Sequence, residues 1–347
     1  MYIKKIIVAI ALIGVAGGGI FSYIIYNKFF APNTAFNNEE AHIYIKSDAS
    51  YSDVRADLEP IIKNLSSLDA VAERKGYITH IKPGHFIIKK GSNNNEIINS
   101  IRSNNVPINV SFNNQERIED LAGRVAQQIE ADSLSLITAF EDPEFLKSQE
   151  LTQETALTLY LPNSYQFYWN TDAEGFRSKM VREHTNFWSQ ERIAKAKAQG
   201  LTPQQAYILA SIVQKETVKA DERAKVAGVY LNRLQNGWKL DADPTVIYAV
   251  KKKDGDFNKI IKRVLYKDLE TDSRYNTYKY AGLPPGPIFM PDLSALNAVL
   301  NPEKHDFYFF VADVSRPGYH MFAKNVSQHN ANRRQYIDWI NKQGINR

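Results

Sequence analysis

Glu216 occupies a position in the sequence that suits acid–base chemistry. It follows Leu209 by seven residues, Ile212 by four and Val213 by three, so in a helix it continues their apolar face. Burial on such a face desolvates the ionised carboxylate and raises its pKa, and general-acid catalysis at neutral pH requires a raised pKa of this kind. The alternative is structural: the side chain turns aside to cap the backbone or to pair with Arg223.

Polar residues further along the chain could have either a structural or a functional role. Asp243 immediately precedes Pro244, an arrangement that suits the N-cap of a short helix as well as a ligand for a substrate. His320 and His329 lack metal-ligand spacing with any third residue, so we expect hydrogen-bonded roles and no metal site. No motif implies a cofactor.

Two predicted helices position Glu216. The first begins with Thr202 as N-cap, Pro203 at the first helical position and Gln205 in capping-box register, and it continues to about residue 218. The second covers residues 221–237 and ends at a glycine. Near the C-terminus, a strand at 307–312 and the run YHMF at 319–322 are joined by a hairpin turn.

Composition narrows the chemistry. The chain has 347 residues, with 43 Lys and Arg against 38 Asp and Glu, which gives a formal charge of +5. This length predicts about two domains, and the hydrophobic content excludes disorder over most of the chain. The absence of cysteine excludes disulfides, thiolate nucleophiles, iron–sulfur clusters and cysteine zinc sites. The modest positive charge fits an anionic surface or polymer and falls short of a nucleic-acid footprint.

The N-terminal segment predicts a transmembrane helix at residues 6–26. These 21 residues carry no charge, and at about 1.5 Å per residue a helix of this length covers the ~30 Å hydrocarbon core of a bilayer. Lys4 and Lys5 precede it and only Lys28 follows closely, so the positive-inside rule places residues 1–5 in the cytoplasm and the rest across the inner (cytoplasmic) membrane. The alternative is a cleaved signal peptide, for which Ala31 and Ala35 offer a poor cleavage site.

The exported part divides into a linker at 27–40, a small α/β module at 41–112, connecting helices at 113–150 and a larger domain at 151–347. In the module, the pattern GxFxIxxGS from Gly84 to Ser92, followed by a helix, resembles a LysM-like unit, which is associated with polymers of N-acetylglucosamine. The alternative is a packing domain that only spaces the larger domain from the membrane. In the larger domain, the run LYLPNSYQFY at 159–168 is expected to be an irregular loop, either a sugar platform or part of the core.

Six ordered runs between residues 211 and 329 resemble the endolytic murein transglycosylases, the MltG or YceG-like family. They are SIVQKET (211–217), VAGVYLNRL (226–234), DADPTVIYAV (241–250), YNTYKYAGLPPGPI (275–288), FYFFVAD (307–313), and HMF (320–322) with His329. The resemblance implies an α+β chain with an anchor, a LysM-like module and a mainly helical, lysozyme-like catalytic domain that carries a small β-hairpin. The family's catalytic glutamate falls on Glu216. Many members have a second acid where this chain has Gln214, which removes a rival candidate.

The resemblance also implies a reaction, a peptidoglycan lytic transglycosylation. It cleaves the β-1,4 bond between N-acetylmuramic acid and N-acetylglucosamine in nascent strands, forms a 1,6-anhydro ring and so limits strand length. Glu216 acts first as acid and then as base. We expect substrate contacts from Tyr275, Asn276, Tyr278 and His320, with Asp243 and Thr245 ordering the cleft. The implied partners are glycan strands and the peptidoglycan synthases of the same membrane.

Two other functions remain open at the level of sequence. The first is a membrane-tethered peptidoglycan-binding protein without activity, which would use the LysM-like module. The second is a lysozyme-type hydrolase in which Asp243 supplies the second carboxylate that hydrolysis requires.

Overall fold

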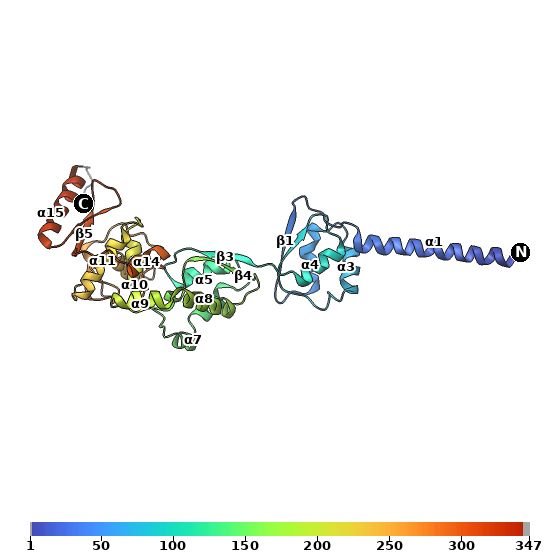
Figure 1. Ribbon diagram of the computed structural model, residues 1–347, viewed down its shortest axis with the longest axis horizontal. Helices are drawn as coiled ribbons and strands as arrows, with labels where there is room; N and C mark the ends of the chain where they lie inside the picture. The colour runs from blue at the N-terminus through green and yellow to red at the C-terminus, as the bar shows by residue number, and fades with distance from the viewer. Residues whose placement is uncertain (1, 343–347) are drawn as a thin grey trace. The chain divides into compact units, whose positions relative to one another are not determined.

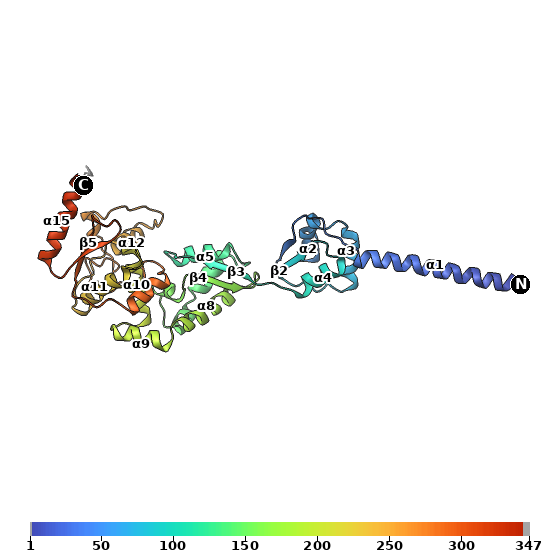
Figure 2. The same cartoon turned by 45° about the horizontal axis from the view of Figure 1, so that its top comes forward.

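The computed structural model describes residues 2–342 and divides into two compact units (Figures 1 and 2). The first unit contains the residues up to Val110 together with Gln128–Ala131 and Tyr165–Asp172. The second contains Ser111–Gln127, Asp132–Ser164 and the residues from Ala173 onward. Most of the predicted connecting segment, 113–150, therefore belongs to the same unit as the predicted larger domain.

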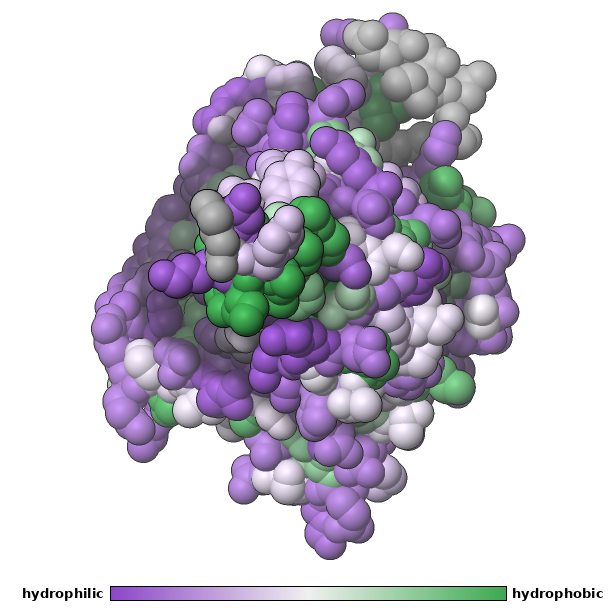
Figure 3. Space-filling model, turned by 90° about the vertical axis from the view of Figure 1, so that its right-hand side faces the viewer, coloured by the Kyte–Doolittle hydropathy of each residue, from purple (hydrophilic) through white to green (hydrophobic). Residues whose placement is uncertain are grey.

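The chain begins with a long apolar helix, α1 (Tyr2–Phe30), which contains the predicted membrane span. None of its residues is buried, and large apolar side chains such as Ile10 and Val15 are more than 60% exposed. In Figure 3, which faces the N-terminal side, hydrophobic residues gather at the centre of the view among hydrophilic ones, as expected for α1 seen end on. A helix of 29 residues is about 43 Å long. Its length and uniform apolarity are compatible with a single-pass membrane anchor.

The globular part of the first unit is a small α/β module. Its elements are β1 (Glu40–Ile45), α2 (Tyr51–Leu58), η1 (Glu59–Ile61), α3 (Leu65–Arg74), β2 (Gly84–Lys89) and α4 (Asn94–Ser103). β1 pairs antiparallel with β2, and Ile43 lies opposite Phe86. The predicted apolar side of α4, with Ile97, Ile98 and Ile101, is fully buried against this sheet and α3. The strand and helix predictions for this module are confirmed, and its likeness to LysM stays a prediction.

The segment between α1 and β1, predicted as a polar linker, is packed onto the module. Helix α1 continues to Phe30, and Pro32 and Thr34 form isolated bridges with Asn93 and Ile62. Asn33, between them, is only 5% exposed. The segment packs although its composition is polar, because Asn33 and Thr34 form hydrogen bonds with the backbone of the module.

The second unit is mainly helical, as predicted. Its helices are α5 (Ile118–Ala126), α6 (Ser133–Phe140), α7 (Pro143–Ser148), η2 (Ala156–Leu159), α8 (Ala173–Phe187), α9 (Gln190–Ala198), α10 (Pro203–Glu216), α11 (Arg223–Gln235), α12 (Asp243–Asp254), α13 (Tyr266–Leu269), α14 (Leu293–Leu300) and α15 (Val326–Lys342). Residues 206–213 of α10 are all buried, in contact with α11, α12 and α14. This helix is therefore the core element of the unit.

Two sheets of two strands complete the chain. β3 (Ile108–Phe112) pairs with β4 (Asn163–Phe167), and the boundary between the units passes through both strands. β5 (Phe309–Ala312) and β6 (His320–Ala323) form the predicted antiparallel hairpin, with Ala312 opposite His320. The run 159–168 contains β4 in place of a continuous loop, and its buried Tyr160 and Tyr165 support the core reading over the sugar platform.

The hairpin is fastened to α11 by the segment that precedes it. Asn232 donates hydrogen bonds to the carbonyls of His305 (2.8 Å) and Phe307 (2.9 Å). This close approach depends on Gly228, because a Cβ there would lie 2.5 Å from the carbonyl oxygen of Glu303. Because Gly228 has no side chain, the segment that leads into β5 can pack directly against α11.

We predict that Gly228→Ala lowers the free energy of unfolding by about 1–3 kcal/mol, because the added methyl group forces the two backbones apart. Gly123→Ala in α5 is the matched control. Its Cβ would meet nothing within 4 Å, so the better helix propensity of alanine should stabilise the chain by about 0.5–1 kcal/mol. Urea unfolding of the full chain in detergent measures both, and equal effects of the two substitutions would contradict this packing.

Candidate active site

Helix α10 carries Glu216 as its last residue, and its start is built as predicted. Thr202 is the N-cap, Pro203 is the first helical residue, and Thr202 and Gln205 bond reciprocally in a capping box. Leu209, Ile212 and Val213 are fully buried below the carboxylate. The apolar face of the helix therefore brings a carboxyl to the edge of the core.

Glu216 lines a pocket of about 420 Å³. The walls come from α10, α11, the loop before α12, the loop that holds Tyr278, the β5–β6 hairpin and α15. They comprise Glu216, Tyr230, Arg233, Leu240, Asp241, Asp243, Tyr278, Phe309, Phe310, Val311, Ala312, His320 and His329. A concave site with aromatic rings beside convergent polar groups is the usual form of a ligand-binding site.

The Glu216 carboxyl has one strong hydrogen bond and a raised pKa. The hydroxyl of Tyr230 donates to its Oε1 at 2.6 Å. Burial raises the pKa of Glu216 to about 7; the Tyr230 hydrogen bond lowers it, the charge of Asp243 raises it and that of Arg233 lowers it. Arg223 pairs with Asp292 at 2.8 Å, so the structural alternative of a Glu216–Arg223 pair is wrong. At neutral pH this carboxyl is divided between its acid and base forms.

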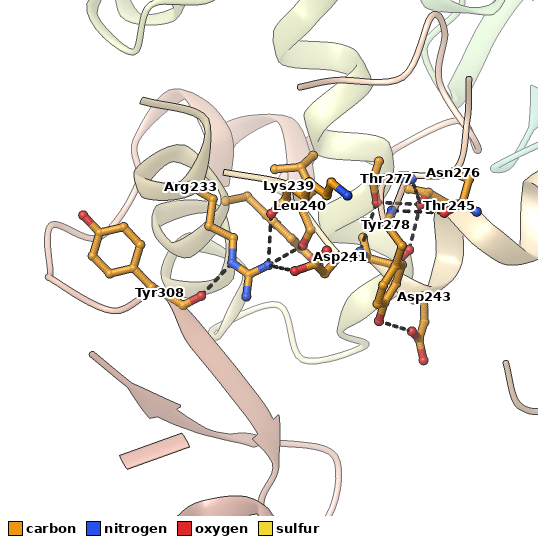
Figure 4. Close-up of polar contacts among 12 residues, drawn as sticks. Arg233, Lys239, Leu240, Asp241, Asp243, Thr245, Asn276, Thr277, Tyr278 and Tyr308 are labelled. Carbon is orange, nitrogen blue, oxygen red and sulfur yellow. Dashed lines mark hydrogen bonds and ion pairs between the residues drawn. The ribbon is translucent and has the colours of Figure 1, made fainter. Parts of the chain in front are cut away.

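Asp243 lines the same pocket and is held by a tyrosine (Figure 4). The hydroxyl of Tyr278 donates to its Oδ1 at 2.6 Å. The N-cap of α12 is Ala242 and Asp243 is the first helical residue without a capping hydrogen bond, so the prediction of Asp243 as N-cap is wrong. The Asp243 carboxylate lines the pocket, as the alternative of a substrate ligand requires.

A buried arginine fixes the loop between Asp243 and α11 (Figure 4). Arg233 is 8% exposed, and its guanidinium donates to the carbonyls of Leu240 (2.9 Å) and Tyr308 (2.7 Å) and to Asp241 (3.0 Å). Asp241 has a φ of +49°, a strained conformation for a residue with a side chain. Burial raises the pKa of Asp241 and Arg233 opposes this effect. The guanidinium of Arg233 thus ties the loop to the residue before β5.

On the hairpin side, His320 is bonded to a buried carboxylate. Glu222, 6% exposed, accepts from the backbone N–H of His320 at 2.8 Å and lies 2.7 Å from its Nδ1. Thr217 adds a third bond to Glu222 at 3.2 Å. The imidazole, itself mostly buried, lines the pocket beside the ring of Phe310. Glu222 therefore fixes the place of the ring and of the strand that carries it.

The structure brings three of the predicted substrate residues to Glu216, namely Asp243, Tyr278 and His320. Thr245 and Asn276 are fully buried behind the wall; Thr245 bonds the hydroxyl of Thr277 at 2.8 Å, and Asn276 donates to two backbone carbonyls. Their hydrogen bonds hold the loops around the site in place. The ring of Tyr275 lies tilted against that of Tyr248, with the centroids 4.7 Å apart, and lines a different cavity.

Sequence reasoning missed Tyr230, Arg233, Asp241 and Glu222. Tyr230 and Arg233 lie three residues apart in VAGVYLNRL, so they share one helix face. An arginine on the same helix face as buried residues indicates a charged group inside the fold, and this signal could have identified Arg233. Nothing in the sequence indicates the pairing of Glu222 with His320, because these residues are 98 positions apart.

We predict that two substitutions move the pKa of Glu216 in opposite directions from its value near 7. Tyr230→Phe removes a hydrogen bond that favours the carboxylate, so the pKa should rise. Asp243→Asn removes a negative charge that disfavours it, so the pKa should fall. Titration of ¹³C-labelled glutamate by NMR, with the Glu216 signal assigned by its loss in Glu216→Gln, measures both shifts. Shifts in the same direction would contradict the arrangement of charges described here.

The sequence and the fold are similar to those of known proteins. The family model described as the YceG-like family matches residues 43–335. The chain is 28% identical to the endolytic murein transglycosylase of Bacillus subtilis (strain 168), over 94% of this chain and 92% of that protein. It is 24% identical to the protein of the same name from Streptococcus pneumoniae serotype 2 (strain D39 / NCTC 7466), over 97% of this chain and 65% of that longer protein. The 2.6 Å crystal structure of a YceG-like protein from Listeria monocytogenes aligns with a TM-score of 0.54 and 26% identity, over 85% of this chain and 99% of that one. The chain belongs to the YceG-like family.

Proposed function

We propose that this chain is a membrane-anchored endolytic lytic transglycosylase of peptidoglycan. The observation that carries the proposal is the Glu216 carboxyl, with a pKa near 7, at the edge of a pocket lined by aromatic rings and polar groups. Two relatives that match nearly the whole chain bear the name endolytic murein transglycosylase. The substrate bond is the β-1,4 link between N-acetylmuramic acid and N-acetylglucosamine within glycan strands, and its cleavage limits strand length.

In the first step Glu216 acts as an acid. Tyr230 occupies Oε1, which leaves Oε2 to exchange a proton with the substrate. The carboxyl donates this proton to the glycosidic oxygen while the bond from that oxygen to C1 of the muramic residue breaks. The N-acetylglucosamine side leaves with a new 4-hydroxyl, and the muramic ring becomes an oxocarbenium-like cation. The carboxylate of Asp243, in the same pocket, stabilises this positive charge.

In the second step the same group acts as a base. The Glu216 carboxylate, still bonded by Tyr230, removes the proton of the muramic C6 hydroxyl, and O6 attacks C1 to close the 1,6-anhydro ring. The carboxyl is protonated again and the cycle consumes no water. A pKa near 7 suits both steps, because a catalyst that gives and takes the same proton works best near the ambient pH.

A lysozyme-type hydrolase is the second candidate. The observation in its favour is that Asp243 lines the same pocket and its charge acts on Glu216. In that mechanism Asp243 is the nucleophile or the base for a water molecule. The Tyr278 hydrogen bond to Asp243 favours its ionised form, which suits this role as well as charge stabilisation, so the product of the reaction separates the two candidates.

We predict that purified full-length protein converts glycan strands to fragments that end in anhydromuramic acid, measured by mass spectrometry. Glu216→Gln keeps the shape and the Tyr230 contact but cannot donate the proton, so the rate should fall about 10²–10⁴-fold. Asp243→Asn should slow the reaction by a smaller factor and leave the product unchanged. Strands that stay intact with the native protein would favour a binding protein, and loss of all turnover in Asp243→Asn would favour the hydrolase.

We further propose that Glu222 positions His320 for the sugar. A carboxylate is only an acceptor, so the proton of a neutral imidazole resides on Nδ1, the atom 2.7 Å from Glu222. Nε2 is then an acceptor on the pocket side, ready for a hydroxyl or N-acetyl N–H of the substrate. The role is one of positioning, since Glu222 itself does not line the pocket.

Glu222→Gln tests this role, because a glutamine amide can donate to Nδ1 and so reverse the tautomer of His320. We expect ¹⁵N NMR to show the proton moved to Nε2 and kcat to fall about 10-fold or more with a smaller change in KM. Thr217→Val is the control, since it removes another bond to Glu222 and leaves the imidazole contact in place. A reversed tautomer with unchanged kcat would contradict the role of Nε2.

The proposal also covers the membrane anchor, the small module and the protein partners. Helix α1 is inserted in the inner membrane with Lys4 and Lys5 on the cytoplasmic side, so the pocket faces the periplasmic or extracytoplasmic side where glycan is made. The small α/β module is the candidate for a second glycan contact. Peptidoglycan synthases are the candidate protein partners, because they make the strands that this reaction ends.

A further inference from the structure

A second, polar cavity of about 470 Å³ lies where α1 meets the α/β module. It is lined by the last turn of α1 and by residues at the starts of α3 and α4, and these elements belong to one unit. Its walls contain Lys28 and Lys63, four asparagines and two serines. Among the described residues that line it, none is acidic.

The walls of this cavity are built around two buried asparagines. Asn94 is 1% exposed and donates to the carbonyl of Lys28 (2.7 Å) and to the Ser67 hydroxyl (2.9 Å). Asn33, 5% exposed, donates to Asn94 at 2.6 Å, and its own Oδ1 accepts from the backbone of Asn64. This network fixes the end of α1 on the module, so the position of the cavity relative to the apolar helix is set.

The two lysines supply the charge of the site. Lys28 and Lys63 are exposed, and neither ammonium group forms an ion pair with another residue in the part of the chain that the structure describes. Lys28 follows the last residue of the uncharged stretch 6–26 by two positions. If α1 spans a bilayer, that stretch fills the hydrocarbon layer and the cavity lies among the lipid phosphates just outside it.

We propose that this cavity binds the phosphate of an anionic phospholipid headgroup. The lysines neutralise the phosphate charge, and the side chains of Asn27, Asn64 and Ser66 donate hydrogen bonds to its oxygens, which is the chemistry that anionic headgroups require. The bound lipid joins the module to the surface of the membrane. The proposal rests on the insertion of α1 and is independent of the proposed reaction.

Full-length protein in vesicles of phosphatidylcholine, with or without phosphatidylglycerol, tests the site. Native mass spectrometry after gentle extraction measures the phosphatidylglycerol that stays bound. For Lys28→Gln with Lys63→Gln we expect a loss of affinity of about 30-fold, since each lysine near anionic lipid contributes about 1 kcal/mol and 1.4 kcal/mol is tenfold. The control is Lys46→Gln with Lys82→Gln, two exposed lysines of the same unit outside the cavity, which should retain the lipid.

Flotation of each variant with vesicles separates the possible failures. A native chain that floats but holds phosphatidylglycerol no better than phosphatidylcholine overturns the headgroup site and leaves the anchor intact. Equal losses in the two double variants also overturn it, because general attraction would then explain the binding. A chain that does not float overturns both the anchor and the site. Preferential retention of an isoprenoid pyrophosphate over phosphatidylglycerol would overturn the choice of phospholipid.

Discussion

The desolvation of the Glu216 carboxyl is the constraint on which the site depends. Burial stabilises its neutral form, and the Tyr230 hydrogen bond stabilises the charged form enough to bring the pKa back to about 7. A deeper carboxyl without Tyr230 would not ionise at neutral pH and could not act as a base. A solvated carboxyl would have lost its proton and could not act as an acid.

The surrounding fold maintains this balance by fixing the walls of the pocket. Arg233 holds the loop with Asp241 against the start of β5, and the pair of Thr245 and Thr277 holds the backbone before α12. Glu222 holds the opposite strand through His320. Most of these contacts join segments that are distant in sequence, so the pocket exists only when α10, α11, α12 and the hairpin have come together.

A structural feature was predictable from the sequence when it depended only on residues that are close to it in the chain. The start of α10, its apolar face and the direction of Glu216 depend on residues within two helical turns, and these predictions are confirmed. The same holds for α4, the helix predicted after Ser92, and for the β5–β6 hairpin. The break between α8 and α9 depends on tertiary packing as well, because Trp188 is buried there and Ser189 serves as a new N-cap.

The predictions that depended on tertiary contacts were less successful. Asp243 has the local pattern of an N-cap, yet Ala242 takes that place and donates its backbone N–H to the Thr277 hydroxyl, while the Asp243 carboxylate accepts from Tyr278. Tyr275 and Asn276 belong to a run that resembles the family, but the fold turns both away from Glu216 while their neighbour Tyr278 enters the pocket. Neighbouring residues in a loop point in different directions, and only the packing of the loop decides which of them reaches a substrate.

The central claim is that one carboxyl both breaks the glycosidic bond and closes the new ring without water. Digestion of glycan strands in H₂¹⁸O, followed by mass spectrometry of the isolated fragments, tests it most directly. Our account predicts anhydro ends that contain no ¹⁸O. Ends that carry one ¹⁸O atom at C1 would contradict it and would show that water, activated by a second carboxylate, completes the reaction.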